Sequence, residues 1–399
     1  MKGWRTKRLG ELCEIELGKT PARANSTYWD EKRETDNVWL SIADLLKAEE
    51  YTVVDSKEYV SDKGAAMCKL VPKGTLLVSF KLTLGRLAFA GRDLFTNEAI
   101  AALTIIDESE LAKEFLFYFL HYFDWVRAAE NDVKLKGMTL NKAKLKEMAV
   151  HFPPLLEQRR IVGILDEAFD GIATAKANAE RNLQNARAVF ESHLQSVFSQ
   201  RGEGWVDRTL DQVCIVERGS SPRPIKKYFT TKPDGVNWIK IGDTEEGGKY
   251  VFATAQKITP EGAQRSRFVK EGDFILTNSM SFGRPYIMRT TGYIHDGWFL
   301  LRLNATIDTD YFYYLLSSRF VQDQFALLAS GSVVKNISGD LVKRAILPIP
   351  PLAAQHVIVN RLVELSAETQ RLESIYERKR AALEALKKSL LDQAFSGKL

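Results

Sequence analysis

The chain reads Pro153-Pro-Leu-Leu-Glu-Gln158 and, 197 residues later, Pro350-Pro-Leu-Ala-Ala-Gln355. Each Pro-Pro pair interrupts regular structure, and the composition changes after it. From 157 to about 200, and again from 353 to about 395, the sequence has no proline and is rich in Ala, Leu, Glu, Arg, Lys and Gln. Because these residues have high helix propensity, the two stretches predict two long helices that begin at the same repeated motif.

The apolar residues of both stretches have the spacing of a coiled-coil seam. In the second stretch, steps of four and three residues alternate through Ile358, Leu362, Leu365, Thr369, Leu372, Tyr376, Lys379, Leu383, Leu386 and Leu390. In the first, the pattern runs through Ile161, Leu165, Ala168, Ile172, Ala175 and Ala179, shifts by one residue, and continues through Leu183, Ala186, Phe190, Leu194 and Val197. Two such seams in one chain predict that the helices pair with each other as an antiparallel coiled coil.

The repeat extends through the rest of the chain. At an offset of 201 residues, Gly3, Trp4, Leu9, Cys13, Gly18 and Pro21 recur as Gly204, Trp205, Leu210, Cys214, Gly219 and Pro222. At an offset of 198, Val71, Gly74, Gly85 and Arg86 recur as Val269, Gly272, Gly283 and Arg284. An offset that drifts slowly along a common order of landmarks indicates an internal duplication with small changes in loop length.

Each copy also contains a segment of mixed composition, in which runs of β-branched and aromatic residues alternate with Gly, Asn and Asp turns and with short helical stretches. The clearest strand-like runs are 74–80 and 272–277, and the clearest helical stretches are 111–129 and 310–328. The predicted fold class is therefore α+β, with two similar mixed domains separated by two long antiparallel helices and related by an internal pseudo-two-fold axis. The predicted segments are a first globular domain at 1–152, a central helix at 153–204, a second globular domain at 205–349 and a C-terminal helix at 350–399 that pairs with the central one.

The composition excludes several classes of protein. The 399 residues are 45% hydrophobic and 27% charged, which is not the composition of a disordered, collagenous or disulfide-scaffold chain. The longest run without Asp, Glu, Lys or Arg, 345–360, is shorter than the roughly 20 apolar residues of a spanning helix, and the first residues do not lead into a signal-peptide core. Three cysteines predict no disulfide framework and a cytoplasmic location. The net charge of +5 permits a polyanionic partner without requiring one.

Catalytic signatures are absent from the sequence. Gly18-Lys19-Thr20 looks like the end of a phosphate-binding loop, but Cys13 stands where that loop needs a glycine. The five histidines are isolated in sequence, and no carboxylate motif of a metal-dependent nuclease occurs. Cys13 and Cys214 occupy equivalent positions of the repeat, which favours a repeated packing position over a reactive thiol. We therefore expect binding rather than catalysis, with no catalytic residue, no metal site and no cofactor bound by this chain.

Two similar but non-identical domains joined by long helices suit a long, periodic ligand with two separated determinants, and duplex DNA is such a ligand. The first candidate contacts come from one loop in each copy: Lys81, Thr83 and Arg86 in the first, and Asn278, Ser279, Ser281 and Arg284 in the second. These side-chain types contact base edges and phosphates. Since the arginines are shared and the other residues differ, we expect phosphate-binding or structural roles for the arginines and base reading for the rest.

A second set of candidates lies before the long helices. Lys134 and Lys136 belong to a group of five lysines between 134 and 146, and the second copy has Lys335 and Asn336 at the corresponding place. A lysine group of this kind is often only a solvated face, but on a DNA-facing surface it contributes counterion release. Basic residues that follow Pro21 and Pro222 form a third, weaker set: Arg23, Arg223, Lys226 and Lys227.

The whole chain resembles the specificity subunit of type I restriction-modification systems. The resemblance rests on the repeated Gly-Trp, on the repeated Pro-Pro-Leu-x-x-Gln motif, on the two long helices, and on the ending Ala394-Phe395-Ser396-Gly397-Lys398-Leu399. It implies that each globular part is a target recognition domain that reads one half of a bipartite, asymmetric site in double-stranded DNA. It also implies that the helices fix the spacer and dock two modification (methyltransferase) subunits, while restriction/translocase subunits join outside them. Methylation, ATP hydrolysis and cleavage then belong to those partners, which bind S-adenosylmethionine, ATP and Mg.

One alternative belongs to another functional class. A two-headed coiled-coil scaffold, whose domains bind proteins and whose helices oligomerise, fits the same repeat and the same seams. It predicts that no DNA sequence is preferred, and that polar substitutions of the seam leucines dissociate a homo-oligomer.

Overall fold

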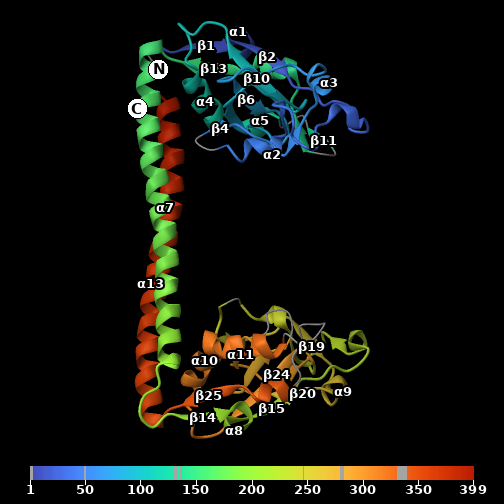
Figure 1. Ribbon diagram of the computed structural model, residues 1–399, viewed down its shortest axis with the longest axis vertical. Helices are drawn as coiled ribbons and strands as arrows, with labels where there is room; N and C mark the ends of the chain where they lie inside the picture. Colours follow the sequence, from blue (N-terminus) through green and yellow to red (C-terminus); the bar gives the residue numbers. More distant parts are fainter. Residues whose placement is uncertain are drawn as a thin grey trace. The chain divides into compact units, whose positions relative to one another are not determined.

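The computed structural model describes residues 3–48, 51–129, 133–134, 137–245, 247–278, 283–329 and 339–399, with the backbone alone at 133–134, 137–139 and 329. The described chain forms two compact units (Figure 1). The first comprises Met1–Asn178 and Lys379–Leu399, and the second comprises Ala179–Arg378. Each unit therefore contains one globular part together with parts of both long helices.

The globular part of the first unit is built on a five-stranded sheet. In spatial order its strands are β2 (Cys13–Leu17), β10 (Ile100–Ile105), β6 (Leu76–Ser79), β8 (Leu87–Ala90) and β4 (Thr52–Val53). A three-stranded sheet consists of β5 (Glu58–Tyr59), β3 (Val38–Leu40) and β9 (Phe95–Thr96). The remaining pairings are β1 (Arg5–Arg8) with β13 (Ala149–Phe152), and β11 (Val133–Lys134) with β12 (Gly137–Thr139) and β7 (Lys81–Leu82). The helices are α1 (Leu9–Leu12), η1 (Ser26–Tyr28), α2 (Ile42–Leu45), α3 (Asp62–Ala65), α4 (Lys113–Tyr122), α5 (Trp125–Ala128) and α6 (Lys142–Glu147).

The second unit repeats this topology. Its main sheet has the order β15 (Cys214–Arg218), β24 (Trp298–Leu303), β21 (Phe274–Thr277), β22 (Pro285–Met288) and β18 (Tyr250–Val251). A second sheet contains β16 (Phe229–Thr230), β19 (Gln256–Ile258), β17 (Val236–Ile239), β23 (Gly292–Ile294) and β20 (Arg267–Val269), and β14 (Val206–Thr209) pairs with β25 (Ile346–Ile349). The helices are α8 (Leu210–Val213), η2 (Ile225–Lys227), η3 (Ile241–Asp243), α9 (Pro260–Ala263), α10 (Thr309–Ser317), α11 (Arg319–Ala329) and α12 (Gly339–Lys343). The predicted duplication and the predicted α+β class are both confirmed by this correspondence.

The central strand of the main sheet in each unit, β6 or β21, is buried on both faces, and successive residues of a strand point to opposite faces. In β6, Leu76 and Val78 join a large core with α4 and the long helices, whereas Leu77 joins a separate core with the three-stranded sheet. In β21, Phe274 and Leu276 likewise belong to the large core of the second unit, whereas Ile275 belongs to a separate core on the other face of the sheet. A strand buried on both faces reads as a continuous apolar run, which is the pattern that marked 74–80 and 272–277 in the sequence.

The two predicted long helices are confirmed as α7 (Leu155–Ser199) and α13 (Leu352–Phe395). Their antiparallel pairing is visible within the first unit, where Arg160 donates to the backbone oxygen of Leu399, just past the end of α13, and Lys176, further along α7, pairs with Glu384 at 2.7 Å. As the residue number rises on one helix it falls on the other, so the helices run in opposite directions. In the second unit, Arg187 contacts Glu373 at 2.5 Å.

The glutamine of the repeated Pro-Pro-Leu-x-x-Gln motif anchors the start of each long helix through hydrogen bonds. Gln158 is 0% exposed and its side chain bonds three backbone groups: it accepts from Ala112 N at 2.9 Å and donates to Glu110 O and Pro153 O, each at 2.8 Å. Gln355, 1% exposed, accepts from Asp308 N at 2.8 Å in the second unit. The first turn of each long helix is thereby tied to the segment that precedes α4 or α10.

The seams are buried to different degrees. Every predicted seam position of α7 is buried or half-buried, but on α13 Leu386 is 47% exposed and Lys379 is also exposed. The fully buried residues of α13 lie near its ends: Gln355, Val359, Leu362, Leu391, Ala394 and Phe395. Most of these residues belong to the large cores of the globular parts, so domain packing covers them, whereas in the middle of the helix a single partner helix covers only one side.

The two equivalent cysteines are core residues. Cys13 and Cys214 are each 2% exposed, and burial raises the pKa of both thiols to about 12. A thiol of that pKa is almost entirely protonated at neutral pH and is a poor nucleophile.

Within the described chain, no group of three or more His, Cys, Asp or Glu residues is arranged to hold a metal ion. Nor does any described helix combine the length and the apolar composition needed to cross a membrane.

Candidate nucleic-acid interface

Three segments that are far apart in sequence converge at one edge of the main sheet in each unit. In the first unit they are 18–23 after β2, 96–99 before β10, and 80–86 after β6. Backbone hydrogen bonds join them: Lys19 N donates to Thr96 O at 2.8 Å, and Phe80 N donates to Ala99 O at 3.0 Å. The segment that contains Lys81, Thr83 and Arg86 and the segment that contains Arg23 therefore both lie beside 96–99.

The second unit brings together the three equivalent segments. Ser220 N donates to Ile294 O at 3.2 Å, and Asn278 N donates to Gly297 O at 2.8 Å. A glycine makes the approach possible in both copies. A Cβ at Gly18 would lie 2.2 Å from the carbonyl oxygen of Asn97, and one at Gly219 would lie 2.0 Å from that of His295. The repeated glycine is thus explained by packing and not by phosphate binding.

The last residue of β6 and of β21 carries a hydroxyl that closes the candidate loop after the strand. Ser79 Oγ accepts from Arg86 N at 3.0 Å and donates to Thr83 O at 2.5 Å. In the second unit, Thr277 Oγ1 accepts from Arg284 N at 2.9 Å. The loop displays Thr83 on the exposed surface, while Lys81 is half-buried with its ammonium 5.2 Å from the centroid of the Phe80 ring.

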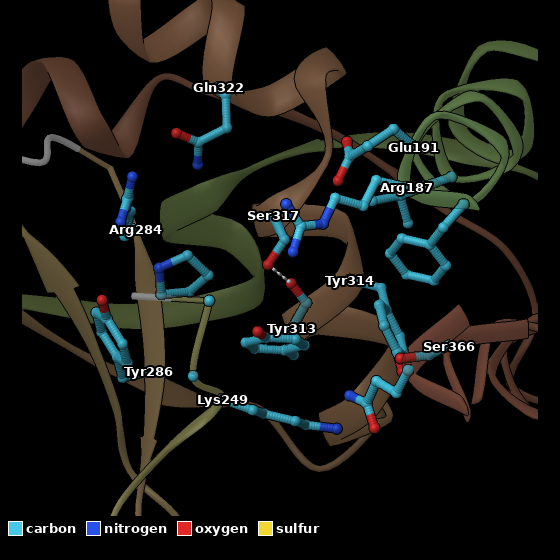
Figure 2. Close-up of a pocket in the computed structure, with 16 residues that line it drawn as sticks. Arg187, Glu191, Lys249, Arg284, Tyr286, Tyr313, Tyr314, Ser317, Gln322 and Ser366 are labelled. Carbon is cyan, nitrogen blue, oxygen red and sulfur yellow. Dashed lines mark hydrogen bonds between the residues drawn. The ribbon is translucent and has the colours of Figure 1, made fainter. Parts of the chain in front are cut away.

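The two arginines shared by the copies turn inward. Nη1 of Arg86 is buried and has no hydrogen-bond partner among the described residues. Arg284 lines a cavity of about 750 Å³ that is bounded by α10, α11 and the two long helices. Figure 2 shows its guanidinium near Gln322, on the same side of the cavity as Tyr286. These positions favour the structural role over the phosphate-binding role for both arginines.

The charges at the other side of that cavity are already paired. Lys249 donates to Asp310 at 2.6 Å, and its ammonium lies 4.9 Å from the centroid of the Tyr313 ring. Burial raises the pKa of Tyr313 to about 12, so its hydroxyl stays neutral. Arg187 of α7 is paired with Glu373 of α13. The cavity therefore joins a domain to its helices and is not a surface that attracts polyanions.

The first unit unites two sets of sequence-predicted candidates. β7, which contains Lys81, pairs antiparallel with β12 in a register that places Thr139 opposite Lys81. β12 in turn pairs with β11, and Lys134 lies opposite Gly137. The loop after β6 and the lysine-rich segment are therefore neighbours in one small sheet. Five other candidates lie outside the described residues: Lys136, Ser279, Ser281, Lys335 and Asn336.

Asn278 does not reach the surface. Its side chain is 1% exposed, and Nδ2 donates to Asp296 O at 3.2 Å. Asn278 occupies the place that Phe80 has in the first unit, and Phe80 is 0% exposed. The sequence placed it beside polar loop residues, but the hydrogen bond from its backbone N–H to Gly297 holds it in the sheet edge.

Sequence reasoning missed one pair of acidic residues, Glu98 and Asp296, in the middle segment of each copy. Ser221 donates to Asp296 Oδ1 at 2.5 Å and Arg223 donates to Oδ2 at 3.1 Å. The hydrogen bond from Ser221 lowers the pKa of Asp296, and the charge of Arg223 lowers it further, against an opposing effect of burial. The offset of 198 that relates Arg86 to Arg284 also relates Glu98 to Asp296, and this signal in the sequence could have found them.

Glu98 is held in the same way in the first unit. Thr20 donates to Glu98 Oε2. Burial acts to raise the pKa of Glu98, but the hydrogen bond from Thr20 and the charges of Lys81 and Arg23 outweigh it and lower the pKa. Each copy thus presents an ionised carboxylate, a hydroxyl and nearby cations at one edge. Such a surface offers hydrogen-bond acceptors and donors to base edges and phosphates.

Comparison with known proteins agrees with the repeat. The family model of the type I restriction modification DNA specificity domain matches the chain twice, at residues 1–182 and 202–379. The MjaIX specificity subunit of Methanocaldococcus jannaschii, a type I restriction enzyme subunit, is 26% identical over 250 residues, 57% of this chain and 55% of that protein. This chain therefore spans about half the length of that relative. The MjaVIII specificity subunit of the same organism is 22% identical over 427 residues, 99% of this chain and 93% of that protein.

Two solved structures share the fold. One comes from work on complex assembly and conformational transition of the type I R-M system; it has a TM-score of 0.78 and 19% sequence identity, and the match covers 100% of this chain and 99% of that one. The HsdS subunit from Thermoanaerobacter tengcongensis has a TM-score of 0.58, also with 19% identity, and the match covers 100% and 98%. Since the family model accounts for both copies of the repeat, the chain belongs to the family of type I restriction-modification DNA specificity domains.

Proposed function

We propose that this chain is the DNA-binding specificity subunit of a type I restriction-modification complex. Each globular part reads one half of a bipartite, asymmetric DNA site. The observation that carries this proposal is the repeated edge. The same three segments converge in both copies, yet the cations beside the shared acid differ: Lys81 acts on Glu98 in one copy, and Arg223 bonds Asp296 in the other. Two such surfaces suit two unlike half-sites.

The long helices have two roles in this proposal. They fix the number of base pairs between the half-sites, and they dock two modification (methyltransferase) subunits, with restriction/translocase subunits joining outside. Exposed apolar side chains on the helices, such as Leu156 at 84% and Val357 at 70% exposure, support a partner surface. The chain itself contributes no catalytic group. S-adenosylmethionine, ATP and Mg are bound by the partners, and the complex works in the cytoplasm.

The test is to map DNA methylation in a host that carries this chain together with its neighbouring methyltransferase gene, and in the same host without this chain. The expected result is a modified adenine motif that consists of two unlike halves with a fixed gap, and that disappears when this chain is removed. If a functional methyltransferase gives the same pattern with and without this chain, the proposal is wrong.

A further inference from the structure

Asp296 is a surface carboxylate of the candidate interface that several hydrogen bonds hold in place. Its side chain accepts from Ser221 and Arg223, while its backbone oxygen accepts from Asn278 Nδ2 at 3.2 Å and from Arg218 Nε at 3.3 Å. Four side chains from three segments therefore fix the position of one acidic group. The surface beside it is hollowed, with a cavity of about 690 Å³ that is lined by Ser221, Pro222, Arg223, Pro224, Ile225, Lys226 and Asp296.

A purely structural clip does not need a charged group here. Neutral acceptors form equivalent hydrogen bonds with a hydroxyl, and a carboxylate on a surface that meets phosphates adds repulsion. The acid is nevertheless present in both copies. Glu98 is bonded to a hydroxyl of the segment that follows β2, and Asp296 to a hydroxyl of the segment that follows β15. A carboxylate has about four acceptor sites, so it can bond the hydroxyl and a ligand at the same time. A role that depends on the charge explains why an acid is present twice.

The donor beside Asp296 defines what the pair recognises. Arg223 has an 80% exposed side chain and gives one N–H to Asp296 at 3.1 Å, whereas a guanidinium has five N–H donors. The pair therefore presents an acceptor and a donor next to each other on an exposed surface. In the major groove, a C·G base pair presents the N4 donor of cytosine next to the O6 and N7 acceptors of guanine, and carboxylates and arginines are their usual partners.

We propose that Glu98 and Asp296 are base-reading acceptors, one in each domain, and that Asp296 together with Arg223 reads a C·G base pair through the major groove. This inference rests on the proposed function and adds to it the residues and the base pair. In the first domain, Arg23 is already engaged with Glu58 and with the face of Trp29, 4.0 Å from its ring centroid. Lys81 is the other cation near Glu98, because Phe80 N donates to Ala99 O at 3.0 Å and so brings the start of its segment beside the acid. We therefore assign Lys81 as the donor that accompanies Glu98.

Asn278 has a positioning role in this arrangement. Because its side chain is buried and bonds the backbone of Asp296, it orients the acid without touching DNA. Replacing Asn278 by Ala should then weaken the preference at the base pair read by Asp296 and leave the other positions of the site unchanged. A purely structural role would instead lower binding to all sequences alike.

The experiment selects duplexes from a library of randomised double-stranded DNA with the full chain, in complex with its methyltransferase subunits, and compares wild type with Asp296→Asn. The amide keeps the size of the side chain but loses the charge and gains a donor. We expect one C·G position of one half-site to lose its preference on the order of ten-fold, while the other half-site is unchanged. Glu98→Gln should affect one position of the other half-site only.

Asp207→Asn is the matched control, because Asp207 also forms a surface pair with an arginine, Arg201, at 2.5 Å. It should leave the selected motif unchanged. Asp296→Glu, which keeps the charge, should retain cytosine at the affected position with a smaller preference. If Asp296→Asn gives the wild-type motif, or weakens all sequences equally, the inference is wrong. If the wild-type complex itself selects no motif, it is the proposed function that fails.

Discussion

Gln158 and Gln355 hold the start of each long helix against its globular part, and they do so from buried positions. Replacing Gln158 by Ala removes three hydrogen bonds and leaves Ala112 N, Glu110 O and Pro153 O without this partner. Buried backbone groups that lose their partners are costly, so we expect a loss of roughly 2–4 kcal/mol in the free energy of unfolding. Urea unfolding, followed by circular dichroism, measures it.

Gln200→Ala is a suitable control, because Gln200 is exposed just beyond the end of α7. It should change the free energy of unfolding by less than about 0.5 kcal/mol. Gln355→Ala should be destabilising as well, since Gln355 makes the same kind of contact to Asp308 N and Pro350 O. Equal effects of Gln158→Ala and Gln200→Ala would contradict the role given to the repeated motif.

Gly85 and Gly283 are the second pair of repeated residues with a testable cost. Both have positive φ, 74° and 75°. A Cβ at Gly85 would lie 2.3 Å from Trp125 Cδ1, whereas one at Gly283 would lie 3.0 Å from both Gln322 Oε1 and Phe325 Cδ2. We therefore expect Gly85→Ala to be the more destabilising substitution, because the overlap with the Trp125 ring is deeper than any overlap at Gly283. Both substitutions share a left-handed backbone cost of about 1–2 kcal/mol.

The same measurement has a control of opposite sign. Gly171 is exposed on α7 and a Cβ there would have nothing within 4 Å. Because alanine is the better helix former, Gly171→Ala should stabilise the chain by about 0.5–1 kcal/mol. From the highest to the lowest denaturation midpoint, the order should be Gly171→Ala, wild type, Gly283→Ala and Gly85→Ala. Any other order contradicts the steric argument.

At the scale of elements, the helix seam carries a prediction of its own. Leu362 and Leu386 lie on the same seam of α13 in the sequence pattern, but Leu362 is 0% exposed and Leu386 is 47% exposed. Leu362→Ala should cost roughly 2–5 kcal/mol, while Leu386→Ala should cost less than about 1 kcal/mol, because the leucine is already in contact with water. Thermal unfolding of the two variants in parallel distinguishes them.

The long helices and the strands buried on both faces were predictable, because composition and periodicity extend over many residues. The exposure of Leu386 was not, because it depends on where the globular parts pack against α13. In the candidate interface, the loop at 80–86 was found by its polar residues, and the burial of Asn278 was missed because the hydrogen bond to Gly297 joins residues distant in sequence. Glu98 and Asp296 were missed because a single acid in a turn carries no local pattern.

At the scale of the whole molecule, the division into units suggests how to exchange one half-site. The second unit is a continuous segment, Ala179–Arg378, and contains its own parts of both helices. The contacts of its globular part with Phe198 and Leu362 therefore stay within the exchanged segment. Replacing 179–378 by the corresponding segment of another family member should change one half of the methylated motif and preserve the other, as read by methylation mapping. A change in both halves would show that the domains do not read independently.

The role of the helices as a ruler can be tested through the two ion pairs that mark facing positions. Lys176 pairs with Glu384 in the first unit and Arg187 pairs with Glu373 in the second. The segments 177–187 of α7 and 373–383 of α13 are equally long, so duplicating both together preserves each ion pair. Duplicating both segments once adds roughly 16 Å to the helix pair at about 1.5 Å per residue, which is about half a turn of DNA. Adding two extra copies of each brings the increase to roughly 33 Å, which is about one full turn.

We expect one extra copy to abolish the bipartite motif, because the two half-sites would then face opposite sides of the duplex. Two extra copies should restore both half-sites on the same face, with a spacer longer by about 10 base pairs. Methylation mapping reads both results, and circular dichroism confirms that the helices remain folded. If both variants keep the original spacer, the helices do not set the distance. If both lose the motif while the protein stays folded and bound to its methyltransferase subunits, the ruler role is equally wrong.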